Sequence, residues 1–251
     1  MPSVYLSPST QESNAFVTGG TEEQYMNMIA DAMIPYLQRY GISYGRNTPE
    51  MTARSSIAQS NAGNYDLHVA IHSNASGPDQ EGQNRGSIIF YYPTSQNGLR
   101  FANLVRNNFT GIYPLPNLVR TEATTSLGEV SQTRAPASLI EVAFHDNYAD
   151  ANWIVNNIDT IALAIANSIA QYFGIPVTGG GPSQPDAQQR GRVTLTSGYL
   201  NIRNNPSTSA QIVGTAPNGA TVTILRKVGD WYHIFYNGVY GYVFGQYIRI
   251  I

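Results

Sequence analysis

The residues best suited to chemistry in this sequence lie in two apolar runs, each carrying one ionisable side chain. The first run, DLHVAIHSNAS (66–76), alternates as a β-strand does, and His72 stands near its C-terminal end. Open α/β sheets bind their ligands in the loops at that end of the strands. The second run, ASLIEVAFHDN (137–147), carries Glu141 among apolar neighbours, where a carboxylate is costly unless it is paired or bound to a metal. Together they indicate a reactive site at one edge of a sheet.

Glu23, in the first turn of an expected helix, is the third candidate for chemistry. Catalytic zinc is held by about three His or carboxylate ligands and keeps an open position for water. A separate carboxylate then takes a proton from that water and passes it to the leaving amine. Two of the candidates also have a structural reading: Glu23 favours the helix dipole without any metal, and His72 could be a satisfied histidine at a strand end. His68 lies ~13 Å along the same strand from His72, so we do not expect both to hold one metal.

Strands and helices alternate over residues 1–176. The hydrophobic pattern predicts strands at 4–6, 42–45, 66–72, 87–93 and 137–147. It predicts helices at 21–40, 49–61, 98–109 and 149–173, the first of them kinked by Pro35. The stretch 113–134 shows little pattern and is expected to be a long loop. Repeated β–α units predict an α/β domain, with a twisted, mostly parallel sheet flanked by helices.

Composition divides the chain into two domains. Residues 177–190 are rich in Gly, Pro, Gln and Ser and lack a hydrophobic period, which is typical of a linker. Residues 191–251 contain five Lys or Arg and one Asp, whereas the net charge of all 251 residues is −2. The first domain is therefore acidic and the second basic, which indicates two functions on one chain. The expected division is 1–176, a linker at 177–190, and 191–251.

Several classes of protein and site are not indicated by the composition. The sequence has no cysteine, which excludes disulfides and cysteine–zinc sites. Its start, MPSVYLSPSTQESN, shows neither the basic nor the apolar region of a Sec-type signal peptide. No apolar run is long enough to span a bilayer, so no membrane span is expected. Nucleic acid is not an expected partner either.

Four motifs in the first domain occur in the order found in a known enzyme family. They are GTEEQYMN (20–27), RN (46–47), IHSNA (71–75) and EVAFHDN (141–147). With them, residues 1–176 resemble the zinc-dependent N-acetylmuramoyl-L-alanine amidases of the amidase 3 type. The resemblance implies that Glu23 and His72 bind zinc and that Glu141 is the catalytic acid/base. It favours Glu23 over Glu22, because the family's asparagine lies four residues beyond its glutamate, as Asn27 does beyond Glu23.

The first loop of the domain departs from this family. Members usually carry D-P-G-H-G-G there, and the histidine is a further zinc ligand, whereas this chain reads LSPSTQE (6–12) with Thr10 in its place. His145 is the expected substitute, because it follows Glu141 in the loop leaving the same end of the sheet. Gln11 is the weaker alternative, since a neutral amide binds zinc poorly compared with imidazole.

Residues 191–251 predict a small all-β domain. Short alternating runs separated by Gly, Asn and Pro turns indicate strands. The segments GDWYHIFYNG and GYVFGQYI closely resemble a bacterial SH3 domain, a small SH3-like barrel found beside wall hydrolases. Trp231, Tyr242 and Phe244 are expected in its core. Exposed tyrosines beside Arg203 and Arg226 would suit peptide cross-bridges or anionic wall polymers.

These resemblances imply a peptidoglycan hydrolase of the autolysin or endolysin kind, with zinc as cofactor and the SH3 domain targeting the cell wall. The enzyme would cleave the amide between the lactyl group of N-acetylmuramic acid and L-alanine. Without a Sec signal, it would reach the wall after lysis, through holin pores or by another non-Sec route. One alternative is a non-catalytic wall-binding protein whose amidase site has degenerated, although Glu141 has no evident structural purpose. A protein–protein adaptor role for the SH3 part is a third reading.

Overall fold

The computed structural model divides the chain into two compact units, Met1–Gly179 and Gly180–Ile251. The residues it describes are 1–177, 189–203, 206–237 and 239–251. The expected linker, 177–190, falls almost wholly outside these residues, so its boundaries stay a prediction. Within the described part of the chain, no helix has the length and apolarity that crossing a membrane requires.

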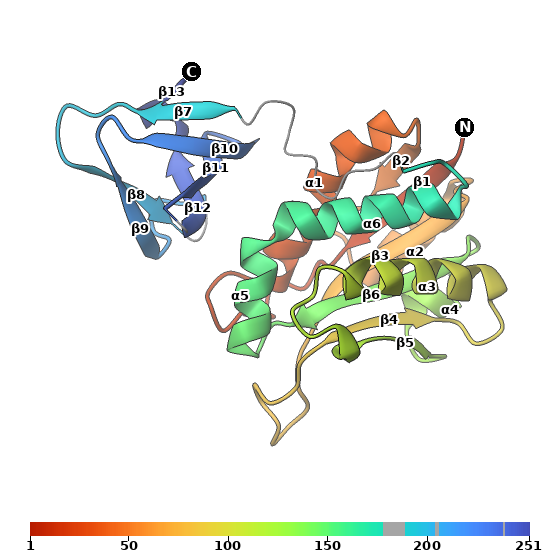
Figure 1. The fold of residues 1–251 in the computed structure, drawn as a ribbon. Coiled ribbons are helices and arrows are strands. Elements are labelled where there is room, and N and C mark those ends of the chain that lie inside the picture. Colours follow the sequence, from red (N-terminus) through yellow and green to blue (C-terminus); the bar gives the residue numbers. More distant parts are fainter. Residues whose placement is uncertain (178–188, 204–205, 238) are drawn as a thin grey trace. The chain divides into compact units, whose positions relative to one another are not determined.

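The first unit is built on a six-stranded sheet (Figure 1). Its strands, in spatial order, are β2 (Ser43–Arg46), β1 (Ser3–Pro8), β3 (Leu67–Asn74), β6 (Ala137–Phe144), β4 (Ser87–Tyr91) and β5 (Val119–Ala123). The first four run parallel to their neighbours, whereas β4 is antiparallel to β6 and carries β5 parallel to itself. The predicted α/β class is therefore confirmed, with a mixed sheet whose direction reverses at one side.

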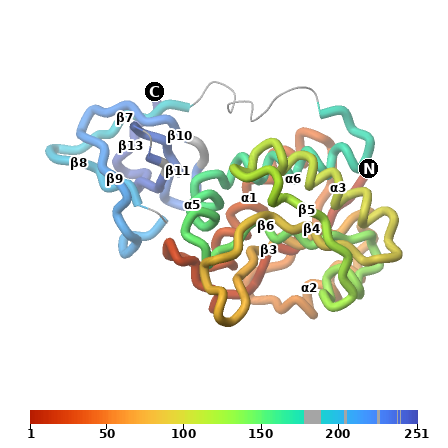
Figure 2. Tube along the Cα trace, turned by 60° about the horizontal axis from the view of Figure 1, so that its bottom comes forward, coloured from red at the N-terminus to blue at the C-terminus, as the bar shows by residue number. Residues whose placement is uncertain are grey.

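Helices cover both faces of this sheet. They are α1 (Glu22–Arg39), α2 (Ala53–Ala62), α3 (Gln96–Thr110), α4 (Gly128–Ser131), α5 (Tyr148–Asn156) and α6 (Ile158–Tyr172). Helices α1 and α3 both pack against α6, and α2 packs against α4. Figure 2 shows α1, α3 and α6 gathered on one side of the sheet and α2 on the other. Such a layered sheet places the loops after its parallel strands at one shared edge.

Two local expectations differ from the structure. Pro35 lies inside α1, which is helical from Glu22 to Arg39, and the kink at this residue stays a prediction. The predicted helix 149–173 is two helices, because Asn157 leaves the helical conformation, with φ −127° and ψ 23°, between α5 and α6. The predicted loop 113–134 contains β5 and the four-residue helix α4. Both are short, and β5 buries only one of its five residues, so neither leaves a clear hydrophobic period.

Strand β3 lies between β1 and β6 and determines where the polar side chains project. Its first five residues are all buried, as expected for a strand covered on both faces. In the parallel pairing of β3 with β6, His72 stands opposite Glu141. Neighbouring residues in register share one face of a sheet, so both side chains project toward the α2 and α4 side. The sequence prediction that these two strand ends meet is confirmed.

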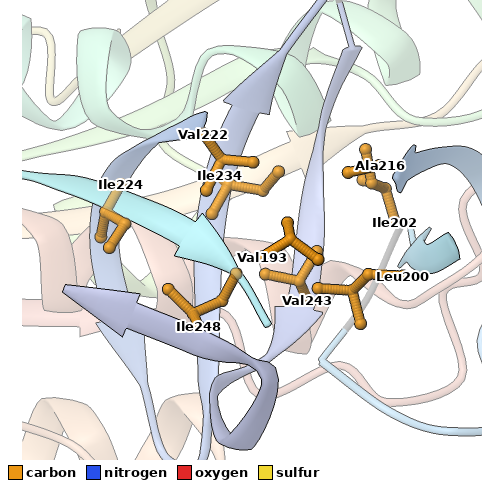
Figure 3. Packing of buried hydrophobic residues seen from close by; sticks show 9 residues of the cluster. All are labelled: Val193, Leu200, Ile202, Ala216, Val222, Ile224, Ile234, Val243 and Ile248. Atoms are coloured by element: carbon orange, nitrogen blue, oxygen red, sulfur yellow. The ribbon is translucent and has the colours of Figure 1, made fainter. Parts of the chain in front are cut away.

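The second unit is a seven-stranded antiparallel sheet of the SH3-like kind that the sequence predicts. Its strands, in spatial order, are β13 (Ile248–Ile250), β7 (Arg190–Val193), β10 (Thr221–Val228), β11 (Trp231–Tyr236), β12 (Val239–Phe244), β8 (Tyr199–Arg203) and β9 (Ile212–Pro217). Nine buried side chains, all aliphatic, converge between these strands in Figure 3. Of the expected aromatic core, Tyr242 is buried, whereas Trp231 and Phe244 are half-buried and pack edge to face on each other.

Candidate active site

His72 lies between two carboxylates, one on each ring nitrogen. Its Nδ1 is 3.0 Å from Oε1 of Glu22, and its Nε2 is 2.9 Å from Oε2 of Glu129. Only 11% of the His72 side chain is exposed, and both carboxylates are nearly inaccessible. The ring is therefore fixed in orientation by charge-assisted hydrogen bonds from both sides.

Glu22 reaches His72 because of how α1 begins. Thr21 is the N-cap, and its hydroxyl accepts the N–H of Gln24, which fixes the first turn. Glu22 is thus the first helical residue, and its side chain turns inward to accept the backbone N–H of Ser73 as well as contacting His72. Asn14 donates its side-chain amide to the other carboxylate oxygen at 2.6 Å. Glu22 is completely buried by these contacts.

The sequence favours Glu23 over Glu22 as the zinc ligand, but in the structure it is Glu22 that contacts His72. One helical residue turns the side chain by about 100° around the axis, away from the sheet edge. There the carboxylate of Glu23 accepts from the side-chain amide of Asn27 at 3.1 Å. Partial burial and then the charges of Glu12 and Glu50 raise the pKa of Glu23, against the opposing charge of Arg46. The asparagine spacing matched Glu23 correctly to Asn27 but did not determine which carboxylate turns inward.

Sequence reasoning missed Glu129, which α4 places at the centre of the site. Its side chain is buried, and besides His72 it contacts the hydroxyl of Ser7 and, at 3.4 Å, Nε2 of His68. The only sequence signal was an acidic residue beside Leu127 and Val130 in a stretch with no helical period. Although His68 and His72 are four residues apart on β3, both reach this one carboxylate.

Glu141 is the third carboxylate near His72. It stands in register with His72, and its buried Oε2 has no hydrogen-bond partner among the described residues. Burial raises the pKa of Glu141 to about 7; the charge of His72 opposes this, and the charges of Glu22 and Glu129 add to it. A carboxylate poised near neutral pH can both accept and release a proton, which is the chemistry expected of Glu141.

His145 does not join this cluster. Its Nδ1 lies 3.0 Å from the hydroxyl and 3.1 Å from the carbonyl oxygen of Ser73, and its ring stacks on Phe16. Successive residues of a strand point to opposite faces, so Ser73 holds His145 on the face of β3 opposite His72. This placement argues against the expected role of His145 as a third zinc ligand.

Opposite charges dominate the electrostatics around His72. Burial acts to lower the pKa of His72, but the hydrogen bonds to Glu129 and Glu22 raise it to about 10. Burial likewise acts to raise the pKa of Glu129, yet its contacts with His68 and His72 lower it to about 2. The pKa of Glu22 is lowered in the same way, because its hydrogen bond to His72 and the charge of that ring outweigh its burial. The cluster is therefore an imidazolium held between two carboxylates.

A cavity of about 430 Å³ opens beside this cluster. Its walls come from the loop after β1 and the start of α2, and His72 and Glu129 form part of its floor. Gln11 also lines it, with its amide nitrogen 3.5 Å from Nδ1 of His72. The side chains that line the cavity are partly apolar and partly polar, so it offers both apolar contact and hydrogen-bonding groups to a ligand.

The donor set around Nδ1 of His72 fits zinc only in part. Among the described residues, no group of three or more His, Asp or Glu side chains is arranged to hold a metal ion. However, Glu22 Oε1 and His72 Nδ1 converge to 3.0 Å, near the ~3.3 Å that separates two ligands of one tetrahedral zinc. The amide of Gln11 lies next to them, and Asn14 donates to the oxygen of that amide at 3.1 Å. A half-turn of the Gln11 amide would bring its oxygen toward His72 but would break this hydrogen bond from Asn14.

Comparisons with solved structures find proteins of the same fold. The structure of the N-acetylmuramoyl-L-alanine amidase AmiC2 of Nostoc punctiforme is 17% identical, with a TM-score of 0.61, and the match covers 69% of this chain and 97% of that one. The catalytic domain of the CD27L endolysin targeting Clostridia Difficile is 20% identical, with a TM-score of 0.57 and coverage of 68% and 98%. These similarities show a shared fold.

Similarity in sequence gives the family. Bacteriocin BCN5 of Clostridium perfringens is 29% identical over 129 residues, which span 50% of this chain but only 14% of that protein. The model of the bacterial SH3 domain matches residues 198–249. The model of the N-acetylmuramoyl-L-alanine amidase family matches residues 9–171, well over half of the chain. The chain therefore belongs to the N-acetylmuramoyl-L-alanine amidase family and carries a bacterial SH3 domain after its amidase domain.

Proposed function

We propose that this chain hydrolyses the amide bond between the lactyl group of N-acetylmuramic acid and L-alanine in peptidoglycan. The observation that carries the proposal is Glu141: its buried Oε2 has no hydrogen-bond partner among the described residues, and it stands in register with His72, which lines the cavity. Membership of the amidase family supplies the reaction class. The SH3 domain would hold the enzyme on the cell wall, which is where it would act.

Glu141 carries the proton transfers of this reaction. It takes a proton from the attacking water as the water oxygen bonds to the lactyl carbonyl carbon. It then gives a proton to the alanine nitrogen as the carbon–nitrogen bond breaks. The products are a lactyl carboxylic acid and a peptide with a free L-alanine amine. A pKa of about 7 suits both steps, since neither accepting nor releasing the proton is strongly disfavoured near neutral pH.

Glu22 and His72 would hold the zinc ion that family membership implies, with Gln11 as the third donor. When bound there, zinc would polarise the scissile carbonyl and lower the pKa of the attacking water. An amide oxygen is a weaker zinc donor than imidazole, so we expect weaker binding than at a site with two histidines. His145 has no part in this site, because Ser73 keeps it on the other face of β3.

The rival is a non-catalytic wall-binding protein, and the weak third donor is the observation in its favour. The observation against this alternative is that Glu141 makes the folded state less stable. Keeping an ionised carboxylate buried beside Glu22 and Glu129 destabilises the fold. No structural gain is evident that would offset this cost, whereas proton transfer explains it.

Product analysis on purified peptidoglycan distinguishes the two functions. The chain, stripped of metal and then reloaded with zinc, is incubated with peptidoglycan, and the digest is assayed for new amino termini and new reducing sugars. An amidase of this specificity releases L-alanine amino termini without reducing ends. Binding to peptidoglycan without any new amino termini would support the non-catalytic alternative. New amino termini of another residue would contradict the proposed bond.

A further inference from the structure

Glu129 lies on the edge of the His72 ring opposite Glu22. Its Oε2 is 2.9 Å from Nε2 of His72, whereas Glu22 contacts Nδ1. The two nitrogens of an imidazole point away from each other. A metal bound at Nδ1 with Glu22 therefore lies on the far side of the ring from Glu129, and the same ion could not take both carboxylates while His72 stays in place.

The carboxylate of Glu129 is itself held by contacts at both oxygens. Its Oε1 accepts from the hydroxyl of Ser7 and lies 3.4 Å from Nε2 of His68, while Oε2 contacts His72. Ser7, His68 and His72 project from the same face of neighbouring strands. Only 4% of the Glu129 residue surface is exposed. A buried side chain fixed by two strands has little freedom, which suits it to orienting another residue.

We propose that Glu129 is the positioning residue of the metal site: it accepts the Nε2 proton of His72 and thereby turns Nδ1 toward Glu22 and Gln11. This role rests on the proposed function, because it supposes that the site binds a metal. A metal-binding histidine commonly donates its other N–H to a carboxylate, which fixes the ring and makes the ligating nitrogen more basic. Ser7 and His68 would support this role indirectly, by holding Glu129.

Glu129→Gln is the direct test, and its first readout is zinc affinity measured by competition with a chromophoric chelator. The substitution keeps the size of the side chain but removes its charge, and we expect zinc to bind about 10–100-fold more weakly. Glu122→Gln is the matched control. Glu122, on β5, is a glutamate of the same 113–134 stretch, and 52% of its side chain is exposed. The zinc affinity of Glu122→Gln should therefore equal that of the parent. The urea midpoint of each variant establishes that it folds.

The ¹⁵N spectrum of His72 in the zinc-loaded protein gives a second readout. The parent should show a protonated, hydrogen-bonded Nε2 and a metal-bound Nδ1, and the Nε2 proton should exchange faster with water in Glu129→Gln. If Glu129→Gln fails to fold, Ser7→Ala replaces it, since it removes a donor to Glu129 and should weaken zinc binding in the same direction.

Two results would overturn the proposal. One is a folded Glu129→Gln protein that binds zinc as tightly as the parent. The other is a folded variant whose turnover falls while its zinc affinity and His72 spectrum stay unchanged, which would mean that Glu129 contacts the substrate. The proposed function is tested by a different measurement. A parent chain that binds zinc but releases no L-alanine amino termini would contradict the proposed function, whereas the zinc titration alone decides the role of Glu129.

Discussion

At the scale of single residues, the site depends on which of two neighbouring glutamates turns inward. Glu22 is completely buried against His72 and Ser73, whereas Glu23 pairs with Asn27 at the surface of α1. Both lie in the first turn of the helix, so both gain the same stabilisation from its dipole, about 0.3–1 kcal/mol. Any large difference between them in metal binding must therefore come from their positions.

Glu22→Gln and Glu23→Gln form a matched pair that tests this difference. We expect Glu22→Gln to weaken zinc binding by more than about 100-fold. This exceeds the loss seen when the changed residue only hydrogen-bonds to a metal ligand. Glu23→Gln should bind zinc almost as the parent does. Chelator competition on the two purified variants measures both affinities. Equal losses, or a larger loss in Glu23→Gln, would restore Glu23 as the ligand.

Glu141 should make the metal-free protein less stable at high pH. Its pKa is raised by folding from 4.5 to about 7, so the folded state prefers the protonated form. The stability from this group is fully present below about pH 4.5 and is lost as the pH rises through 7. Glu141→Gln should therefore be more stable than the parent above pH 7, by at most about 3 kcal/mol, and the gap should shrink toward pH 4.5. Urea unfolding with a chelator at pH 5 and pH 8.5 measures this. A gap that does not change with pH would contradict the burial of an ionised Glu141.

The sequence predicted the part of the site that strands position and missed the part that depends on short or irregular segments. His72 and Glu141 could be placed because a period of two along each strand indicates the face, and the polar residues after each run indicate its end. Glu129 could not, because a four-residue helix is too short for a hydrophobic period. The position of His145 against Ser73 could not be predicted, because sequence distance from Glu141 does not say which face of β3 its ring packs on. Glu22 and Glu23 could not be told apart because they are adjacent in the first helical turn and differ only in the direction of their side chains.

At the scale of elements, Asp150 joins the start of α5 to β4 and β6. Its buried carboxylate accepts from Nε of Arg85 at 2.9 Å and from the hydroxyl of Tyr113 at 2.6 Å. It also accepts from the backbone N–H groups of Gly86 and Phe144, at 3.0 and 3.2 Å. One carboxylate thus satisfies four donors from different segments, including the end of the strand that carries Glu141.

Asp150→Ala should destabilise the amidase domain by about 3–5 kcal/mol, because it leaves a guanidinium and buried N–H groups without their acceptor. Asp31→Ala is the control. Asp31 also pairs with an arginine, Arg46, but 59% of its side chain is exposed, so its loss should cost about 0–1 kcal/mol. Chemical unfolding of both variants gives the comparison. Similar costs for the two would show that the Asp150 contacts add little to the fold.

At the scale of the whole molecule, the chain consists of two compact units with separate cores. The first unit contains every residue of the proposed site, and the second encloses its own aliphatic cluster. A domain with its own core can in principle fold alone. The division of labour between catalysis and wall binding can therefore be tested by cutting the chain between them.

A fragment of residues 1–176 should fold and hydrolyse small soluble muropeptides at the rate of the full chain. On intact walls it should be slower, because the SH3 domain no longer raises the local concentration of substrate. Turbidity loss of purified walls, measured beside muropeptide turnover, separates the two effects. If the fragment lysed walls as fast as the full chain, the SH3 domain would not be a targeting module for that wall.

We propose that Glu141 transfers protons beside the metal site without binding the metal. One paired measurement tests this most directly. Release of L-alanine amino termini from peptidoglycan is measured for the parent and for Glu141→Gln, with the zinc content of each protein determined on the same samples. We predict that the variant keeps its zinc and loses about 10²–10⁴-fold in turnover, the range of general acid–base catalysis. A variant that turns over like the parent, or one that loses its zinc together with its activity, would contradict the claim.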